Sequence, residues 1–263
     1  MKKFALFSIL TVVTNLFAGV TGMDNRSSLR AIIVYDNHPY DERLETDWGF
    51  SCFWEGLEKS ILFDTGANGQ ILLSNMEKLG IRPEQIDVVV LSHIHRDHTG
   101  GLEELLLRNP KIEVWLPHFF PSDFKEGVRK KGATVVEVEK SREICKGAST
   151  SGVIEGWIKE QSLVLDTEKG LIVMTGCAHP RITNILARVK ELFNKDIYLV
   201  CGGFHLAGFY KAEIKDIIAK FRSVGVQKVG PCHCSGDEAR LLFAEEYQED
   251  YIRIGVGKEI VIQ

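Results

Sequence analysis

A dense group of potential metal ligands lies in the segment 93–98, where His93, His95, Asp97 and His98 follow a run of apolar residues. Three of the eight histidines of the chain fall within these six residues, so a polar loop with chance histidines is a poor explanation. His93 and His95, two residues apart at a strand end, fall on one side and can converge on one ion. Asp97 and His98 stand where the chain turns and can face a second ion. Imidazole nitrogen and carboxylate oxygen suit zinc, iron or manganese, so the segment predicts a site for one or two metal ions.

Three further histidines, His179, His205 and His233, each follow a segment that is typical of a β-strand. The apolar runs that precede them are 171–174, 198–200 and 226–229. Glycine or proline stands in each intervening turn, where glycine lets the backbone approach closely and proline fixes the chain direction. Because sites on α/β folds collect at the ends of strands, we expect the three histidines to converge on one pocket.

The six cysteines have no regular spacing that would indicate a disulfide framework, and a chain of this size does not need one. Cys52 and Cys145 are interpreted as small buried residues beside strands. Four others stand close in sequence to the histidines above, where they could bind soft metal ions as thiolates, pair as disulfides or simply be buried. These four are Cys177, Cys201, Cys232 and Cys234.

The elements that must position these residues are indicated by short apolar runs that alternate with amphipathic stretches. The run 86–91 is β-branched, which predicts a strand buried on both faces, and a hairpin is expected to turn at 168–170. Strands are expected at 29–35, 49–55, 60–63, 86–91, 112–116, 163–165, 171–174, 197–200, 226–229, 251–254 and 259–262. Helices are expected at 69–79, 98–107, 182–193, 212–221 and 237–246. Two similar halves without a linker predict an α/β fold of two packed sheets with helices outside, in a single domain of residues 23–263.

The overall charge is slightly negative, since 32 lysines and arginines stand against 36 aspartates and glutamates. This balance shows no excess of basic residues that would attract nucleic acid, so nucleic acid is not an expected partner. Apolar residues make up 44% and charged residues 26%, which is typical of a globular protein whose core does not need a metal to hold it together. A small-molecule substrate is the partner that we expect.

Residues 1–22 differ in character from the rest of the chain. Lys2 and Lys3 precede an uncharged and largely apolar run over 4–18, the pattern of a secretory signal, which predicts export to the periplasm or the medium. The run is too short and too polar to predict a stable membrane span. An ordinary buried N-terminal helix and a true start at Met23 are the two alternative interpretations, and either would make the protein cytoplasmic.

These motifs resemble those of the metallo-β-lactamase superfamily. The resemblance rests on the His-x-His-x-Asp-His pattern of 93–98 and on Asp64 in the segment Phe63-Asp64-Thr65-Gly66. Three further segments are similar to one subgroup, which is named dihydropterin ribofuranosylaminobenzene phosphate synthase and many of whose members are called metallo-hydrolases. These segments are Thr175–Pro180, Gly202–His205 and Pro231–Cys234.

The resemblance covers about residues 30–262 and implies a four-layer αββα sandwich with the metal site at one edge, between the two sheets. It also implies two sets of metal ligands: His93, His95 and His179 for the first ion, and Asp97, His98 and His233 for the second. Asp64 would orient these ligands through hydrogen bonds, unless it is a turn-forming aspartate ahead of Gly66. Two divalent ions are expected, with zinc favoured over iron and manganese.

Two positions depart from the pattern of the superfamily. His205 stands where most superfamily hydrolases have an aspartate that bridges the two ions, and a neutral imidazole cannot bridge as a carboxylate does. His205 is then a terminal metal ligand, a proton donor to the substrate or a structural residue. Asp47-Trp48-Gly49 stands where the subgroup usually has Glu-His-Gly, which puts inheritance of the subgroup's substrate in doubt.

The function that we expect is hydrolysis of a small-molecule ester, a phosphoester or a related substrate, by a metal-bound hydroxide. Asp97 or His205 would manage the proton transfers. The subgroup's name points to a rival function, a condensing enzyme that joins a pterin precursor to a phosphorylated sugar. A di-iron redox protein is a second rival, and a metal-binding protein without turnover is a third.

Overall fold

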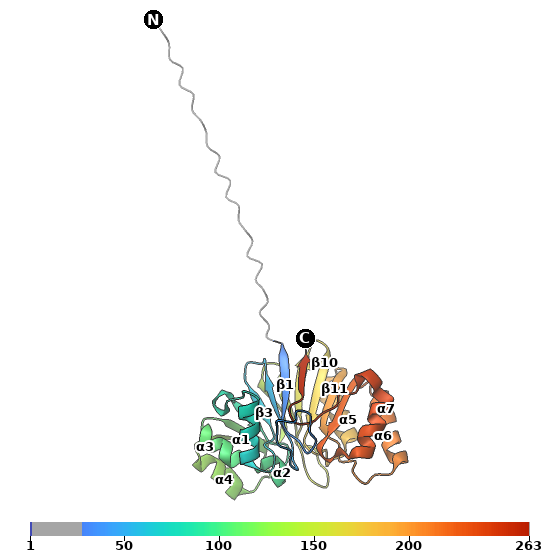
Figure 1. The fold of residues 1–263 in the computed structure, drawn as a ribbon, viewed down its shortest axis with the longest axis horizontal. Coiled ribbons are helices and arrows are strands. Elements are labelled where there is room, and N and C mark those ends of the chain that lie inside the picture. The colour runs from blue at the N-terminus through green and yellow to red at the C-terminus, as the bar shows by residue number, and fades with distance from the viewer. Residues whose placement is uncertain (2–27, 263) are drawn as a thin grey trace.

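Two β-sheets lie face to face and helices cover the outer face of each, in a computed structural model that describes residue 1 and residues 28–262 (Figure 1). Three apolar clusters separate these layers: one between the sheets and one beneath each set of helices. The order of layers is therefore helix, sheet, sheet, helix. The four-layer α/β sandwich predicted from the sequence is confirmed.

The first sheet has seven strands and is formed by the first half of the chain together with the last strand. Its strands from β3 to β6 are parallel, whereas β13, β1 and β2 run antiparallel to their neighbours. In spatial order they are β13 (Glu259–Ile262), β1 (Leu29–Tyr35), β2 (Ser51–Glu55), β3 (Ile61–Phe63), β4 (Val88–Val90), β5 (Glu113–Pro117) and β6 (Thr134–Val138). The helices of this half are α1 (Gly69–Lys78), α2 (Arg96–Thr99), α3 (Leu102–Arg108) and α4 (Ser122–Lys130), with a 3-10 turn η1 (Pro83–Gln85).

The second sheet has six strands from the second half of the chain. Strands β10, β11 and β12 are parallel, and the hairpin of β9 and β10 forms where the sequence predicts it. In spatial order the strands are β12 (Lys228–Cys232), β11 (Ile197–Gly203), β10 (Gly170–Thr175), β9 (Leu163–Thr167), β8 (Ala148–Gly152) and β7 (Lys140–Cys145). The helices are α5 (Ile182–Phe193), α6 (Lys211–Ser223) and α7 (Asp237–Tyr247), with 3-10 turns η2 (His233–Ser235) and η3 (Gln248–Asp250).

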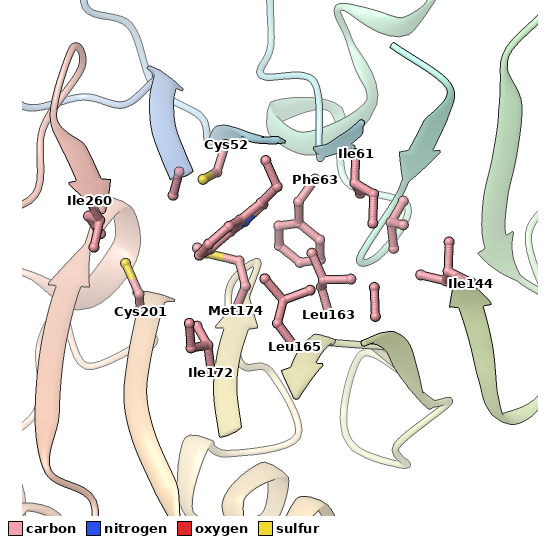
Figure 2. Close-up of a cluster of buried hydrophobic side chains, with 14 of the residues drawn as sticks. Cys52, Ile61, Phe63, Ile144, Leu163, Leu165, Ile172, Met174, Cys201 and Ile260 are labelled. Atoms are coloured by element: carbon pink, nitrogen blue, oxygen red, sulfur yellow. The ribbon is translucent and has the colours of Figure 1, made fainter. Parts of the chain in front are cut away.

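The core between the sheets is built from alternate residues of the facing strands, because successive side chains of a strand point to opposite faces. Phe63 on β3 faces Leu163, Leu165 and Met174 of the second sheet, and all four side chains are fully buried (Figure 2). The outer faces are covered by helices with apolar residues three and four apart, the spacing of one helical face. On α5 the buried residues are Ile182, Ile185, Leu186 and Val189.

Two expectations about single elements were wrong. The helix expected at 98–107 is interrupted at Gly100 and Gly101, where a Cβ atom would lie 2.2 Å from the carbonyl oxygens of Ala67 and Thr65 respectively. The close approach of this backbone replaces regular helix with two short pieces, α2 and α3. The strand expected at 251–254 reduces to one isolated bridge, between Tyr251 and Val229.

The strand directions bring one set of strand ends to the same edge of the sandwich. Strands β1, β3 and β4 of the first sheet end there, and so do β10, β11 and β12 of the second, because the loops that follow them contact one another. The candidate histidines and Asp97 lie in the segments that directly follow these strands, with Asp97 and His98 on the short helix α2. Cys201 and Cys232 lie within β11 and β12 themselves.

The interpretation of residues 1–22 as a secretory signal falls, apart from Met1, outside the described residues. Within the part of the chain that is described, no helix combines the length and apolar character that crossing a membrane requires.

Candidate metal centre

The first group of potential ligands joins the two halves of the molecule. His93 and His95 lie in the loop after β4, and His179 lies in the loop after β10. One ligand atom from each residue lies within 4.8 Å of the others. His93 Nε2 is 3.1 Å from His95 Nδ1, and the His179 ring centroid is 4.8 and 4.9 Å from those of His93 and His95. The structure therefore brings together the three histidines that the sequence assigns to a first ion.

The protonation state of these three histidines is the one that metal binding requires. Burial lowers the pKa of His93, His95 and His179, and that of His179 falls to about 3, with the neighbouring His205 as a further cause. These imidazoles are therefore neutral at physiological pH and keep a free lone pair. Both ring nitrogens of His179 are buried, and no residue in the described part of the chain forms a hydrogen bond with them. A buried polar group without a partner is costly, and a metal ion is the partner that neutral imidazoles bind.

The second group contains the three residues expected from the sequence, Asp97, His98 and His233, together with Cys177. The Asp97 carboxylate lies 3.2 Å from His233 Nε2 and 3.5 Å from His98 Nε2. The Cys177 sulfur lies 3.1 Å from His98 Nε2 and 3.4 Å from His233 Nε2. The sequence names Cys177 only as one of four cysteines that could bind a soft metal ion, pair or simply be buried, and does not assign it to the second ion.

The charges of this group are set by its own members and by Asp64. Burial opposes ionisation of Asp97, but hydrogen bonds from His233 and His98 outweigh it and hold the pKa of Asp97 well below its usual range. Burial also opposes the charged form of His98, but the Asp64 carboxylate raises the pKa of His98 to about 10. Asp97 is therefore anionic, and a cation that bound to His98 would displace a proton.

Asp64 is buried beneath both groups and belongs to neither. Its Oδ2 lies 2.7 Å from His98 Nδ1 and accepts a 2.7 Å hydrogen bond from the Ser92 hydroxyl, while its Oδ1 accepts one of 2.7 Å from the Ser92 amide. The Ser92 hydroxyl oxygen is also 2.9 Å from His93 Nδ1. One carboxylate thus orients His98 directly and His93 through Ser92, which leaves the Nε2 atoms of both rings facing the centre.

His233 is held by a residue from the other half of the chain. Its Nδ1 is 2.9 Å from the side-chain oxygen of Asn37, whose amide group donates a 3.1 Å hydrogen bond to the His233 carbonyl. His233 has a left-handed backbone, with φ of 49°, which is uncommon for a residue other than glycine. Asn37 was not named from the sequence, because nothing in its local pattern links it to a residue 196 positions away.

The loop that carries Cys177 and His179 is shaped by Glu160, a fully buried carboxylate. Its Oε1 accepts hydrogen bonds of 3.0 to 3.1 Å from the backbone amides of 176–178, and its Oε2 accepts one of 3.0 Å from the amide of His179. Burial raises the pKa of Glu160 to about 7, although these hydrogen bonds oppose the rise. Glu160 was not named from the sequence either.

His205 lies beside both groups but is a member of neither. Its ring centroid is 4.4 Å from that of His179, and it shares a third group of potential ligands with Cys177 and Cys234. A hydrogen bond with Cys234 raises the pKa of His205 above its ordinary value, while partial burial opposes the rise. The side chain is exposed, so His205 stands at the entrance of the centre.

Two exposed tryptophans flank the entrance. Trp48 is 53% exposed with its ring 4.9 Å from His233, and Trp157 is 83% exposed with its ring 6.2 Å from His179. Such exposure is rare for tryptophan and is typical of binding surfaces. A cavity of about 420 Å³ adjoins the second group and is lined by Asp47, Trp48, Ala67, Asn68, Arg96 and Asp97.

Comparison with known proteins agrees with this fold and site. Residues 53–186 match the family model of the metallo-beta-lactamase superfamily. The chain is 32% identical over 251 residues to the 7,8-dihydropterin-6-methyl-4-(beta-D-ribofuranosyl)-aminobenzene-5'-phosphate synthase of Methanocaldococcus jannaschii, a match that covers 78% of this chain and 85% of that protein. The subgroup resemblance seen in the sequence is thereby confirmed.

Solved structures give the same result. A crystal structure of a metal-dependent hydrolase of the beta-lactamase superfamily is 31% identical to this chain, with a TM-score of 0.74, and the match covers 88% of this chain and 98% of the other. A metallo-beta-lactamase fold protein from Bacillus subtilis shares the fold at 12% identity and a TM-score of 0.64, over 89% of this chain and 100% of the other. The chain belongs to the metallo-beta-lactamase superfamily.

Proposed function

We propose that this protein is a metal-dependent hydrolase that cleaves a small-molecule ester, with a phosphoester or a related compound as substrate. The observation that carries the proposal is the half-buried His179 ring, whose two nitrogen atoms are buried without a partner among the described residues and which stands beside the neutral His93 and His95. Divalent ions bound in such a centre supply Lewis acidity and make water a nucleophile at neutral pH. The adjoining anionic group at Asp97 supports a second ion.

In this proposal the residues have distinct tasks. His93, His95 and His179 hold one ion, and Asp97, His98 and His233 hold the other. Asp97 stays ionised, so it accepts a hydrogen bond from the attacking water and orients it. His205 has a raised pKa and stands at the entrance, so it can donate a proton to the departing oxygen of the substrate.

The entrance supports a substrate with an anionic group and a flat apolar part. Arg96 is exposed in the cavity wall beside Asp97, and within the described residues its guanidinium has neither an ion pair nor a hydrogen bond. A free guanidinium is suited to bind two phosphate oxygens at once. Trp48 and Trp157 offer aromatic faces on which a planar group can stack.

The test combines elemental analysis with a substrate panel. Protein purified without added metal should contain zinc and should hydrolyse phosphoesters in preference to lactones and thioesters. Chelation should abolish the activity and added zinc should restore it. Arg96→Ala should raise KM about tenfold for a phosphoester and leave KM for an uncharged ester unchanged, since an ion-paired hydrogen bond contributes about 1.5–3 kcal/mol. Iron in place of zinc, without turnover of any ester, would favour a redox protein.

The matched control is Arg108→Ala. Arg108 lies on the last turn of α3 and lines a different cavity, so its loss should leave both KM values as in the parent. Metal-loaded protein that turns over no member of the panel would contradict the proposal.

A second candidate is a condensing enzyme of pterin chemistry. The relative from Methanocaldococcus jannaschii bears a synthase name, and the two exposed tryptophans at the entrance suit a planar pterin ring. A dihydropterin and a ribofuranosylaminobenzene 5'-phosphate offered together to the metal-loaded protein would give a joined product, detected by its mass. Formation of that product, with no hydrolysis of esters, would favour this candidate over the hydrolase.

A further inference from the structure

Three side chains beside the two histidine-rich groups form a third group that contains two sulfur atoms. Cys177, His205 and Cys234 each place one ligand atom within 4.8 Å of the others. They come from the loops after β10, β11 and β12 respectively, so three separate turns converge on one point. Cys177 and Cys234 are buried, while His205 is open to solvent.

The surrounding backbone is built to let the sulfur atoms approach. At Gly203, a Cβ atom would lie 2.7 Å from the Cys234 sulfur and 2.3 Å from the carbonyl oxygen of Gly176. Any other residue there would push the loop of Cys234 away from the loop of Cys177. The Cys234 sulfur lies 3.5 Å from the Cys177 carbonyl oxygen, and His205 has a left-handed φ of 53°, which turns its ring back toward them.

We propose that Cys177, His205 and Cys234 form a third cation position, one that takes zinc or another ion with an affinity for thiolate. In tetrahedral zinc sites with bonds of about 2.0–2.3 Å, neighbouring ligand atoms lie roughly 3.3–3.8 Å apart. One ligand atom of each of the three side chains lies within 4.8 Å of the others, so the group would have to contract to bind an ion. Two thiolates and an imidazole are a donor set selective for soft or borderline ions over manganese or magnesium.

Cys177 belongs to this group and to the second group, so its sulfur can join the two ions. The remaining two ligands are not shared: Cys234 and His205 occur in the third group alone. An ion held by His205 occupies the lone pair of that ring, so binding at the third position and proton donation by His205 exclude each other. The proposal does not rest on the proposed function, with which it shares only His205.

Cobalt titration of reduced, metal-stripped protein tests the proposal directly. Thiolate ligation of Co²⁺ gives a charge-transfer absorption in the near ultraviolet that imidazole and carboxylate ligands do not give. The parent should bind three ions, as counted by elemental analysis after desalting. Cys234→Ser and His205→Ala should each bind one ion fewer, and Cys234→Ser should lose about two thirds of the thiolate absorption, because two of the three sulfur–metal bonds lie at the third position.

The controls separate this proposal from the two-ion centre. Cys145→Ser removes a buried thiol that belongs to none of the three groups, so it should bind and absorb like the parent. His93→Ala should lose one ion and keep the full thiolate absorption. Far-ultraviolet circular dichroism checks that Cys234→Ser is folded, and the exposed His205 provides a variant that does not disturb the core. Two ions in the parent, or parent-like binding by both Cys234→Ser and His205→Ala, would overturn the proposal.

Discussion

At the scale of single residues, the centre contains two kinds of histidine. Those of the first group are neutral because burial disfavours their charged form, whereas His98 is held charged by the Asp64 carboxylate. The first group is thus ready to bind a cation, while the second must give up a proton to do so. We therefore expect the second ion to be lost before the first as pH falls below neutral.

Replacing one ligand of the first group should remove its ion without unfolding the chain. His93→Ala is expected to lose one equivalent of metal and most activity, because two imidazoles hold an ion far less tightly than three. The core does not depend on the ion, so the circular dichroism spectrum should not change. Elemental analysis gives the metal content. His118→Ala, at an exposed histidine outside the three groups, serves as the control. Full metal retention in His93→Ala would show that the first ligand set is wrong.

The negative charge of Asp64 should contribute more to binding of the second ion than the shape of its side chain. Asp64→Asn keeps an oxygen for the Ser92 amide, and asparagine tolerates the left-handed φ of 58° at this position. Loss of the charge beside His98 should weaken binding of the second ion about 10- to 100-fold. Competition with a chromophoric chelator measures the affinity, and Asp123→Asn on α4 is the exposed control. Unchanged affinity for both ions would mean that Asp64 has only a turn-forming role.

The ligands that could be predicted from the sequence are those within a local pattern. His93, His95, Asp97 and His98 are close together in the chain, and the later histidines each follow an apolar run. Asn37 and Glu160 contribute through contacts with residues far away in sequence. The sequence leaves Cys177 as one of four possible thiolate ligands, and only its distance to His98 and His233 places it in the second group. Such contacts depend on how the sheets pack, which no short pattern encodes.

At the scale of elements, the candidate site lies in the loops that follow the strands. The strands themselves could largely be predicted from the sequence. Strand β1 and helix α5 have the bounds that their apolar patterns indicate. No helix or strand was predicted for residues 117–162, yet this stretch contains α4, β6, β7 and β8. Strand β7 is rich in polar residues and is the last strand of the second sheet, whereas β8 pairs on both sides and has small polar residues that are mostly buried. An alternating apolar pattern is weak in both strands.

Glu160 belongs to that stretch and holds the backbone of the loop that carries Cys177 and His179. A change at Glu160 should therefore affect the site through the position of this loop. Glu160→Gln replaces one acceptor oxygen by an amino group that faces backbone amides, so at least one buried hydrogen bond is lost. Stability should fall by about 1–3 kcal/mol, and affinity for the first ion should fall with it. Urea unfolding of the metal-free protein measures the first effect. Glu155→Gln, at an exposed residue, should change stability by less than about 0.5 kcal/mol. An equal effect of both changes would exclude a special role for Glu160.

At the scale of the whole molecule, stability depends on a buried acid at the end of β1. Asp36 is fully buried, one of its oxygens has no hydrogen-bond partner, and burial raises its pKa from near 3.8 to about 6. The folded state therefore holds a proton that the unfolded chain releases between those two values. It follows that this residue's contribution to stability is greatest at low pH and is lost as pH rises toward 6.

Asp36→Asn should remove this pH dependence. The variant keeps an oxygen for the 2.8 Å hydrogen bond from the His38 amide and carries no ionisable group. Relative to the parent, its free energy of unfolding should rise between about pH 4 and pH 6, by up to about 3 kcal/mol. Urea unfolding of both metal-free proteins at several pH values measures the difference. A constant difference across this range would mean that Asp36 does not titrate there.

The pairing of the first and last strands has a practical consequence for anyone who attaches the protein to something else. Leu29 pairs with Ile262, and β1 then runs about 20 Å toward Asn37 and the centre, so the first and last described strands begin and end together, far from the entrance. A tether at either end would leave the entrance facing outward from a solid support. A short linker from Ile262 to Leu29 would join the two ends of this domain, and a circularly permuted protein could be opened in a surface turn such as 168–170 without touching a candidate ligand.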